Sequence, residues 1–306
     1  MIRLGLVGYG KIAADEHVPA IAVTPGCELI AVASRNGRAE GLPNYADLAE
    51  MLNMHPDLDA IALCQPPQVR YETARSALLA GKHVFMEKPP GASVSEVEAL
   101  VALAGQQGVS LYASWHSRHA PGVAELKAWM VPRTITAIAI EWKEDVRRWH
   151  PGQEWIWEAG GFGVFDPGIN ALSILTEVLG ERVRLVGASI TLPANRAAPI
   201  AADLAMQTAS GVPVSAQFDW RQTGAQTWQI RVEAAGESYV FAQGGDDAAH
   251  TAADQDSALG AEYRAMYARF VSLVTTGASD VDLAPLQLVA DAFLRGRMIA
   301  TDPFHF

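Results

Sequence analysis

The chain has 306 residues, of which 50% are apolar and 19% charged, so it is long enough for two domains and too apolar for a disordered chain. Its 23 Lys and Arg residues against 34 Asp and Glu residues give a formal net charge of −11. An acidic chain without a basic stripe is a poor candidate for binding nucleic acid or an anionic membrane surface.

Five apolar runs in the first part of the chain alternate with segments of helical spacing. The runs predict strands at 2–7, 28–33, 59–64, 83–88 and 109–114. The segments between them predict helices at 11–22, 46–53, 69–80 and 93–107, the last with a capping-box pair, Ser93 and Glu96. This alternation predicts an α/β domain of the Rossmann type, with a doubly wound parallel sheet, over residues 1–118.

The pattern changes after residue 118. A helix is expected at 121–131, another after FDPGIN, and closing helices at 261–276 and 285–300. The segments that alternate or are rich in β-branched residues predict strands at 134–143, 184–192, 202–209, 212–220, 227–235 and 237–243. Residues 119–306 are therefore expected to form an α+β domain with a large, predominantly antiparallel sheet.

The turn after the first strand carries the motif Gly8-x-Gly10-x-x-Ala13. Glycines there allow a tight turn and close approach of the backbone to a pyrophosphate, and the following helix offers its N-terminal N–H groups. Because the motif lies between a strand and a helix that open a series of βα units, dinucleotide binding is favoured over an ordinary βα turn.

The end of the second strand bears on which dinucleotide is bound. Enzymes that prefer NAD usually place an acidic residue there, which binds the ribose 2′-hydroxyl. This chain has Ser34-Arg35-Asn36 instead, and an arginine with a hydroxyl suits a 2′-phosphate. We therefore expect NADP to be preferred and NAD to be possible; the alternative is a solvated loop that binds nothing specific.

The fourth strand ends in Glu87-Lys88-Pro89. Open α/β sheets bind ligands at the carboxyl ends of their strands, so Lys88 is expected to face the nicotinamide side of such a cleft. A lysine there can stabilise negative charge on a substrate hydroxyl. A lysine that only extends its charged end into solvent fits the sequence equally well.

The stretch FDPGINALSIL, residues 165–175, predicts the start of a helix. Asp166 precedes a proline, which is typical of a helix N-cap. Asn170 follows one turn later on the same face, so both side chains can also line a cleft. The local sequence leaves the capping and the catalytic interpretation of Asp166 open.

These motifs together resemble the Gfo/Idh/MocA oxidoreductase family. The resemblance rests on GYGKIA, the Glu-Lys-Pro motif, the strand-rich second half and the D-x-x-x-N helix, and it covers essentially the whole chain. Many family members carry D-x-x-x-H at this helix, so Asn170 departs from their pattern. Bacterial pyranose 1-dehydrogenases within the family share this departure. Their sequences are also similar to this chain in the run 142–170 and in the segments 64–71 and 115–118.

The resemblance implies an enzyme that oxidises an aldopyranose of the L-arabinose, D-galactose or D-fucose type at C1, giving the aldonolactone. It implies that Lys88 and Asp166 meet beside C4 of the nicotinamide, with Asp166 as the base. Asn170 and Lys88 would position and stabilise the substrate. The implied substrate-binding residues are Glu144, Trp149, His150 and His116. The implied cofactor-binding residues are Gly8, Gly10, Lys11, Ile12, Ser34, Arg35, Cys64, Gln65, Pro66, Gln68, Glu87 and Lys88.

Two other functions remain open from the sequence. A sugar or cofactor sensor would keep the fold and lose turnover, although the intact Lys88, Asp166 and Asn170 argue against it. A family reductase acting on another carbonyl, or on a ring carbon other than C1, is separated by its product, a keto-sugar in place of a lactone.

Partners and location follow from the remaining features. The uncovered face of the second-domain sheet is expected to be apolar and to form a homodimer or a higher homo-oligomer. Cys27 and Cys64 show no zinc or disulfide spacing, so no metal is expected. No signal peptide and no bilayer-spanning run is evident, which predicts a cytoplasmic protein without a membrane partner. His17 and His83 are expected to serve structure.

Overall fold

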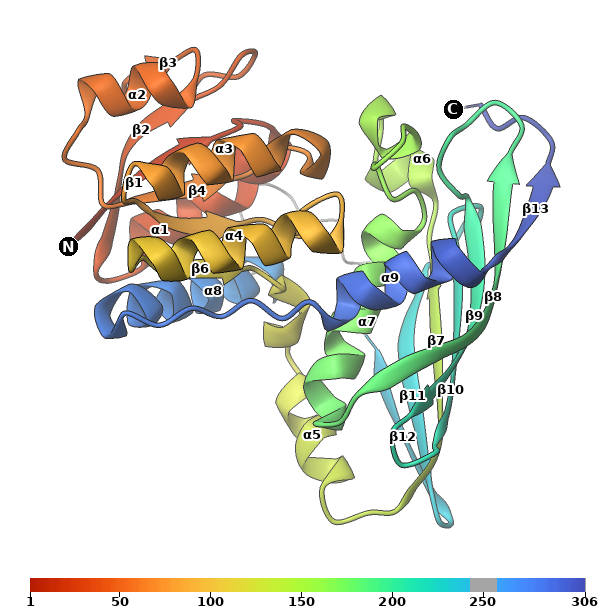
Figure 1. Cartoon of the computed structure of the whole chain (residues 1–306). Coiled ribbons are helices and arrows are strands. Elements are labelled where there is room, and N and C mark those ends of the chain that lie inside the picture. The colour runs from red at the N-terminus through yellow and green to blue at the C-terminus, as the bar shows by residue number, and fades with distance from the viewer. Residues whose placement is uncertain (243–257, 306) are drawn as a thin grey trace. The chain divides into compact units, whose positions relative to one another are not determined.

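The computed structural model describes residues 1–242 and 258–305, which form two compact units (Figure 1). The first unit comprises residues 1–119 and 258–282, and the second comprises 120–242 and 283–305. The chain first crosses between the units at His119 and Ala120, next to the expected boundary. The expected division into two continuous ranges differs from the structure because the chain returns to the first unit.

The first unit is built on a six-stranded sheet in the order β3-β2-β1-β4-β5-β6. All its strand pairs are parallel, so the predicted doubly wound parallel sheet is confirmed. The strands are β1 (Ile2–Val7), β2 (Cys27–Ala33), β3 (Asn44–Tyr45), β4 (Ala60–Leu63), β5 (His83–Met86) and β6 (Leu111–Ala113). The strand order changes direction between β1 and β4, where open α/β sheets bind ligands beyond the carboxyl ends.

The helices predicted in the first unit are present near the expected positions, except that the predicted helix 11–22 forms two elements, η1 and α1. They are η1 (Ala13–His17), α1 (Val18–Val23), α2 (Leu48–Met54), α3 (Pro67–Leu79), α4 (Val94–Gln107) and η2 (His116–His119). The predicted capping box is present, since Ser93 Oγ accepts from the N–H of Glu96 and the Glu96 carboxylate accepts from the N–H of Ser93. Gly108 ends α4 with a φ of 66°.

Helix α8 (Ala258–Thr276) completes the first unit, although it follows the second sheet in sequence. Its buried side chains join residues of α1 and of the parallel strands in one apolar cluster. The members from α8 are Tyr263, Met266, Tyr267, Phe270 and Leu273. The predicted helix at 261–276 is present, but it covers the parallel sheet and not the second one.

The second unit is built on a seven-stranded sheet in the order β12-β11-β7-β10-β9-β8-β13. Two strand pairs are parallel, β7 with β10 and β8 with β13, and the others are antiparallel. The predicted α+β domain with a predominantly antiparallel sheet is therefore confirmed. The strands are β7 (Ile135–Lys143), β8 (Val183–Pro193), β9 (Ala201–Thr208), β10 (Pro213–Asp219), β11 (Thr227–Ala234), β12 (Glu237–Ala242) and β13 (Arg297–Thr301). Residue 243 of the predicted strand 237–243 lies outside the described residues.

The helices of this unit gather on one face of the sheet (Figure 1). They include α5 (Val123–Met130), α6 (Val146–Trp149), η3 (Glu154–Trp157), α7 (Phe165–Leu179) and α9 (Ala284–Arg295). The predicted helix 285–300 is wrong beyond Arg295, because Gly296 adopts an extended conformation and the chain continues as β13. Close packing of α7 on the sheet depends on Gly168, where a Cβ would lie 2.9 Å from the ring of Phe218.

The opposite face of this sheet carries no helix from the described residues and is not apolar. Lys143 Nζ donates to Glu141 and Gln217 at 2.9 Å each, and the amide of Gln229 donates to Glu141 at 2.5 Å. The expectation of a large apolar face is therefore wrong. Alternation along the strands directs the bulky apolar residues to the helix-covered side and leaves small and polar ones outside.

Candidate active site

The glycine-rich turn of the first unit has the geometry that a dinucleotide needs. Gly8 has a φ of 94°, and a Cβ there would lie 2.8 Å from the backbone nitrogen of Gln65, so only glycine fits. A Cβ on Gly10 would meet nothing within 4 Å. Ala14 N–H donates to Gly10 O, which places Lys11 and Ile12 in the first helical turn, where backbone N–H groups lack helical partners. The turn therefore fits a pyrophosphate.

The other cofactor candidates of this unit surround that turn. Cys64 and Gln65 follow β4 and pack their backbone against Gly8. Ser34 Oγ accepts the N–H of Gly37 at 3.3 Å, while Arg35 is exposed beyond the end of β2. The remaining candidates lie at two helix starts: the amine of Lys11 pairs with Asp15 in the turn after β1, and Pro66 and Gln68 lie at the start of α3.

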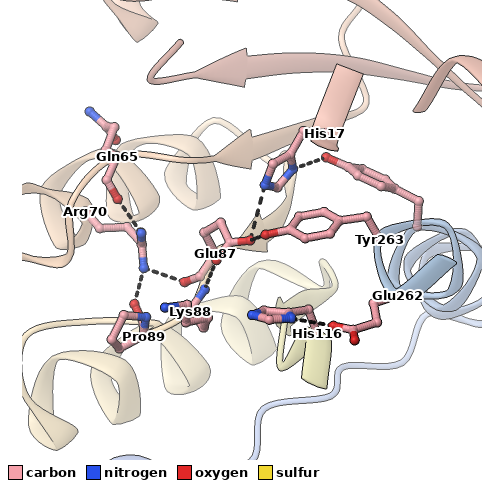
Figure 2. A network of polar contacts seen from close by, with 10 residues as sticks. His17, Gln65, Arg70, Glu87, Lys88, Pro89, His116, Glu262 and Tyr263 are labelled. Carbon is pink, nitrogen blue, oxygen red and sulfur yellow. Dashed lines mark hydrogen bonds and ion pairs between the residues drawn. The ribbon is translucent and has the colours of Figure 1, made fainter. Parts of the chain in front are cut away.

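The Glu87-Lys88-Pro89 turn is held by a buried arginine (Figure 2). The Arg70 guanidinium donates to the backbone carbonyls of Gln65, Glu87 and Pro89, and the residue is 2% exposed. A planar guanidinium with five donors suits such convergent carbonyls. The main chain on both sides of Lys88 is thereby fixed within the first unit.

The carboxylate of Glu87 turns into the interior of this unit. Its Oε1 accepts from Tyr263 at 2.6 Å and contacts His17 Nε2 at 3.2 Å, and its Oε2 accepts the Lys88 N–H at 2.6 Å. Burial opposes its charge, but His17, His116 and Tyr263 more than offset this and lower the pKa of Glu87 to about 2. The backbone of Glu87 is engaged as well, because its N–H donates to Leu63 O and its carbonyl accepts from Arg70. The cofactor-binding role expected for Glu87 stays a prediction.

His17 is the buried imidazole that faces this carboxylate. Burial opposes its charge, but Cys64 and Glu87 outweigh that effect and raise the pKa of His17 to about 10. Its Nδ1 lies 2.7 Å from the hydroxyl of Tyr267. The expectation that His17 serves structure fits this burial, although its contact with Glu87 links it to the site.

His116, a substrate candidate, lies in η2 of the same unit. Its Nδ1 is 2.6 Å from Glu262 Oε2, and its ring stacks on Tyr263 with centroids 5.7 Å apart. Glu262 and Tyr263 are adjacent on α8, so one turn of that helix contacts both His116 and Glu87.

Asp166 belongs to the second unit and is not a helix cap. Helix α7 begins at Phe165 with Val164 as the N-cap residue, and Val164 makes no side-chain capping bond. The N–H of Asp166 donates to Gly163 O, so the turn that starts the helix forms before the aspartate is reached. The capping interpretation is therefore wrong, and the side chain is buried, with 4% of the residue exposed.

Asp166 is one of three titratable groups that the second unit brings together. His150 Nε2 lies 3.5 Å from Glu144 Oε1 and 4.0 Å from Asp166 Oδ2. Glu144 also accepts from two indole N–H groups, of Trp220 at 3.2 Å and of Trp228 at 2.9 Å. Two carboxylates and an imidazole within reach of one another can accept, hold and return a proton.

The other candidates of this unit border the same cluster. Trp149 packs edge-on against Trp228 with centroids 5.0 Å apart and donates to Gln226. Asn170 is half-buried on α7, one turn after Asp166, and its backbone carbonyl accepts from the Ser173 hydroxyl.

The structure thus divides the sequence-predicted residues between the units. Lys88, His116 and the cofactor candidates belong to the first, and Glu144, Trp149, His150, Asp166 and Asn170 to the second. Sequence reasoning missed Trp220, Trp228, Glu262 and Tyr263 as site residues. Each lies in or beside a segment that only predicted a strand or a helix. The described residues contain no cluster of His, Cys, Asp and Glu that could hold a metal ion, and none of their helices is long and apolar enough to cross a membrane.

Comparison with known proteins gives matches along the whole chain. The sequence profile of the Gfo/Idh/MocA oxidoreductase family, an NAD-binding Rossmann fold, matches residues 2–114. Galactose 1-dehydrogenase from Pseudomonas fluorescens is 41% identical over 304 residues, which cover 99% of each chain.

Solved structures agree with these matches. A D-galactose-1-dehydrogenase protein from Rhizobium etli has a TM-score of 0.91 at 49% identity, over 99% of this chain and 98% of its own. GenD2 from gentamicin A biosynthesis, in complex with NAD, has a TM-score of 0.83 at 17% identity, over 96% of this chain and 93% of its own, and shows the fold alone.

Proposed function

This chain belongs to the Gfo/Idh/MocA oxidoreductase family, and we propose that it oxidises an aldopyranose at C1 to the aldonolactone. The observation that carries the proposal is the similarity to two galactose 1-dehydrogenases over 99% of this chain. Sugars of galacto configuration, namely D-galactose, L-arabinose and D-fucose, are the proposed substrates, since they share ring stereochemistry and differ at C5.

Removal of hydride from C1 must be coupled to loss of the proton of the C1 hydroxyl. When bound, the oxidised nicotinamide accepts the hydride at C4. We assign the proton to the carboxylate of Asp166, because Asn170 is an amide and cannot act as a base. Asn170 holds the anomeric and ring oxygens, and Lys88 stabilises the negative charge that develops on the C1 oxygen.

The substrate-binding roles rest on the groups around this carboxylate. We propose that Glu144 and His150 bind sugar hydroxyls, that Trp149 covers an apolar face of the sugar, and that His116 contributes a further polar contact. The indole donors on Glu144 support its role, because they keep the carboxylate in one orientation.

NADP is the proposed preferred cofactor, with NAD also used. The support is the sequence Ser34-Arg35-Asn36 after β2, where an exposed arginine replaces the acid that would bind a ribose 2′-hydroxyl. The proposed assembly is a homodimer through the helix-free face of the second sheet. The cytoplasmic location expected from the sequence stays a prediction.

The function is tested by the initial rate of NAD(P)H formation from D-galactose, L-arabinose, D-fucose and D-xylose with each cofactor. We expect turnover with the galacto-configured sugars and a fall of kcat by about 10²–10⁴-fold in Asp166→Asn, because the base is lost. Asp302→Asn, an exposed change near the C-terminus, is the matched control and should leave kcat unchanged.

Two results would contradict the proposal. An absence of turnover with every aldose and both cofactors would favour a sensor that binds sugar without reaction. A keto-sugar in place of a lactone would identify a family reductase that acts at another carbon.

A further inference from the structure

Glu87 joins three parts of the first unit that are far apart in sequence (Figure 2). Its Oε1 is shared by His17 of η1 and Tyr263 of α8, which lie 70 and 176 positions away along the chain. Its Oε2 accepts the backbone N–H of Lys88. Every part of this carboxylate is therefore engaged by a donor inside the unit.

The donors are themselves held in place. His17 is fully buried, with Tyr267 on its other nitrogen, and its ring packs edge-on against Tyr263 with centroids 4.9 Å apart. The Tyr263 ring in turn stacks on His116. Because both rings are fixed by packing, neither donor can leave Glu87 without a change in the apolar core.

The result is a main chain at Lys88 that is restrained from two directions. Arg70 binds the carbonyls of Glu87 and Pro89, and Glu87 binds the N–H of Lys88 between them. A lysine side chain is flexible, so its placement depends on how firmly its Cα is held. Misplacement of a catalytic group by about 1 Å can cost 10²-fold in rate.

We propose that His17, Glu87 and Tyr263 are positioning residues that fix Lys88 for the reaction. This inference rests on the proposed function for its kinetic part only. It assigns to α8, which follows the second sheet in sequence, a role in the site of the first unit: the helix supplies the Tyr263 hydroxyl that completes the donors on Glu87.

The kinetic test compares Tyr263→Phe and Glu87→Gln with Tyr112→Phe. Tyr263→Phe removes one hydroxyl and keeps the ring. Glu87→Gln replaces one carboxylate oxygen with an NH2 group, which must then face a donor. Both variants are expected to lower kcat by about 10- to 100-fold and to change KM for sugar and NADP by less than about twofold. Tyr112, whose ring packs on Phe85 and Phe270 in the same core, is the matched control and should keep its kcat.

A second readout does not need turnover. Lysines carrying ¹³C-methyl groups after reductive methylation give one NMR signal each, and that of Lys88 is identified with Lys88→Arg. In the full-length protein we expect the Lys88 signal to be displaced from the solvent-exposed position, and to move toward it in Tyr263→Phe and Glu87→Gln but not in Tyr112→Phe.

The two readouts separate the two proposals. If the wild-type protein oxidises no aldose but the Lys88 signal responds as expected, the proposed function fails and the positioning role stands. If the Lys88 signal is the same in wild type, Tyr263→Phe and Glu87→Gln, the positioning role is wrong whatever the protein oxidises. An equal loss of kcat in Tyr112→Phe would also overturn it, because the effect would then be general to the core.

Discussion

Glu87 and Glu144 are each 4% exposed, and each has both carboxylate oxygens occupied. Glu87 is bound by a histidine, a tyrosine and a backbone N–H, and Glu144 by two indoles with His150 close by. A buried carboxylate without such donors would cost several kcal/mol and would take up a proton instead. The donors are thus what allows Glu87 to act as a fixed negative charge, while the two indoles hold the Glu144 carboxylate in one orientation.

The His17–Glu87 pair predicts how stability depends on pH. The pKa of Glu87 falls to about 2 in the folded chain, so its contribution is present above its usual pKa of 4.5 and is lost as pH falls toward 2. The pKa of His17 rises to about 10, so its contribution is present below its usual pKa of 6.5 and is lost as pH rises toward 10. Both contributions to stability are complete only between pH 4.5 and pH 6.5.

Urea unfolding between about pH 7 and pH 9 tests the alkaline side. For a group that is protonated only in the folded state, the free energy of unfolding falls by about 1.4 kcal/mol per pH unit. Glu87→Gln should reduce this slope, because it removes one of the two groups, Cys64 and Glu87, that raise the pKa of His17. Glu181→Gln removes a surface carboxylate bound to Ser210 and should leave the slope unchanged. Equal slopes in wild type and Glu87→Gln would show that Glu87 does not hold the proton on His17.

Among the elements, the turn between β1 and η1 has two glycines with different expected roles: Gly8 in the fold and Gly10 in cofactor binding. Gly8→Ala is expected to destabilise the fold by about 1–3 kcal/mol, because of its positive φ and the nearby Gln65 backbone. Gly10→Ala should leave the melting temperature unchanged, since a Cβ there meets nothing within 4 Å. It should nevertheless weaken NADP binding at least about tenfold, because that space is where we expect the pyrophosphate.

Thermal unfolding and calorimetric titration with NADP measure these two effects separately. Wild-type affinity in Gly10→Ala would show that the pyrophosphate does not approach this turn. A melting temperature lower than that of the wild type in Gly10→Ala would mean that the glycine serves the fold and not the cofactor.

Element boundaries could be predicted where the signal is local. The capping box of α4 and its terminal Gly108 are examples, because a few neighbouring residues decide them. A local signal gave the wrong result at Asp166: the sequence fits an N-cap there, but the N-cap residue is Val164, two residues earlier, because the Phe162–Val164 turn already leads into the helix. From Gly296 onward the sequence predicted a helix, but the chain forms β13, because pairing with β8 outweighs local preference.

At the scale of the whole molecule, the sequence predicted two sheets but not the path of the chain between them. The periodicity of α8 shows that one side is apolar, and it does not say which sheet that side will cover. The same holds for Tyr263 as a partner of Glu87 and for Trp220 and Trp228 as partners of Glu144, which come from segments that carry no motif. The second sheet was predicted with an apolar outer face, whereas the strands place alanine, serine and paired polar groups there.

That outer face still predicts a homodimer. Ser215 of β10 lies between Ala139 of β7 and Ala205 of β9, so small side chains at its centre let a second sheet approach closely. Non-obligate interfaces are about as polar as the rest of a protein surface, so the Lys143–Glu141 pair at its edge is compatible with one. We expect light scattering at micromolar concentration to give twice the mass of one chain, and Ser215→Arg to give a monomer. Ser76→Arg, exposed on α3, should remain dimeric. A monomeric wild type, or a dimer that survives Ser215→Arg, would exclude association through the centre of this face.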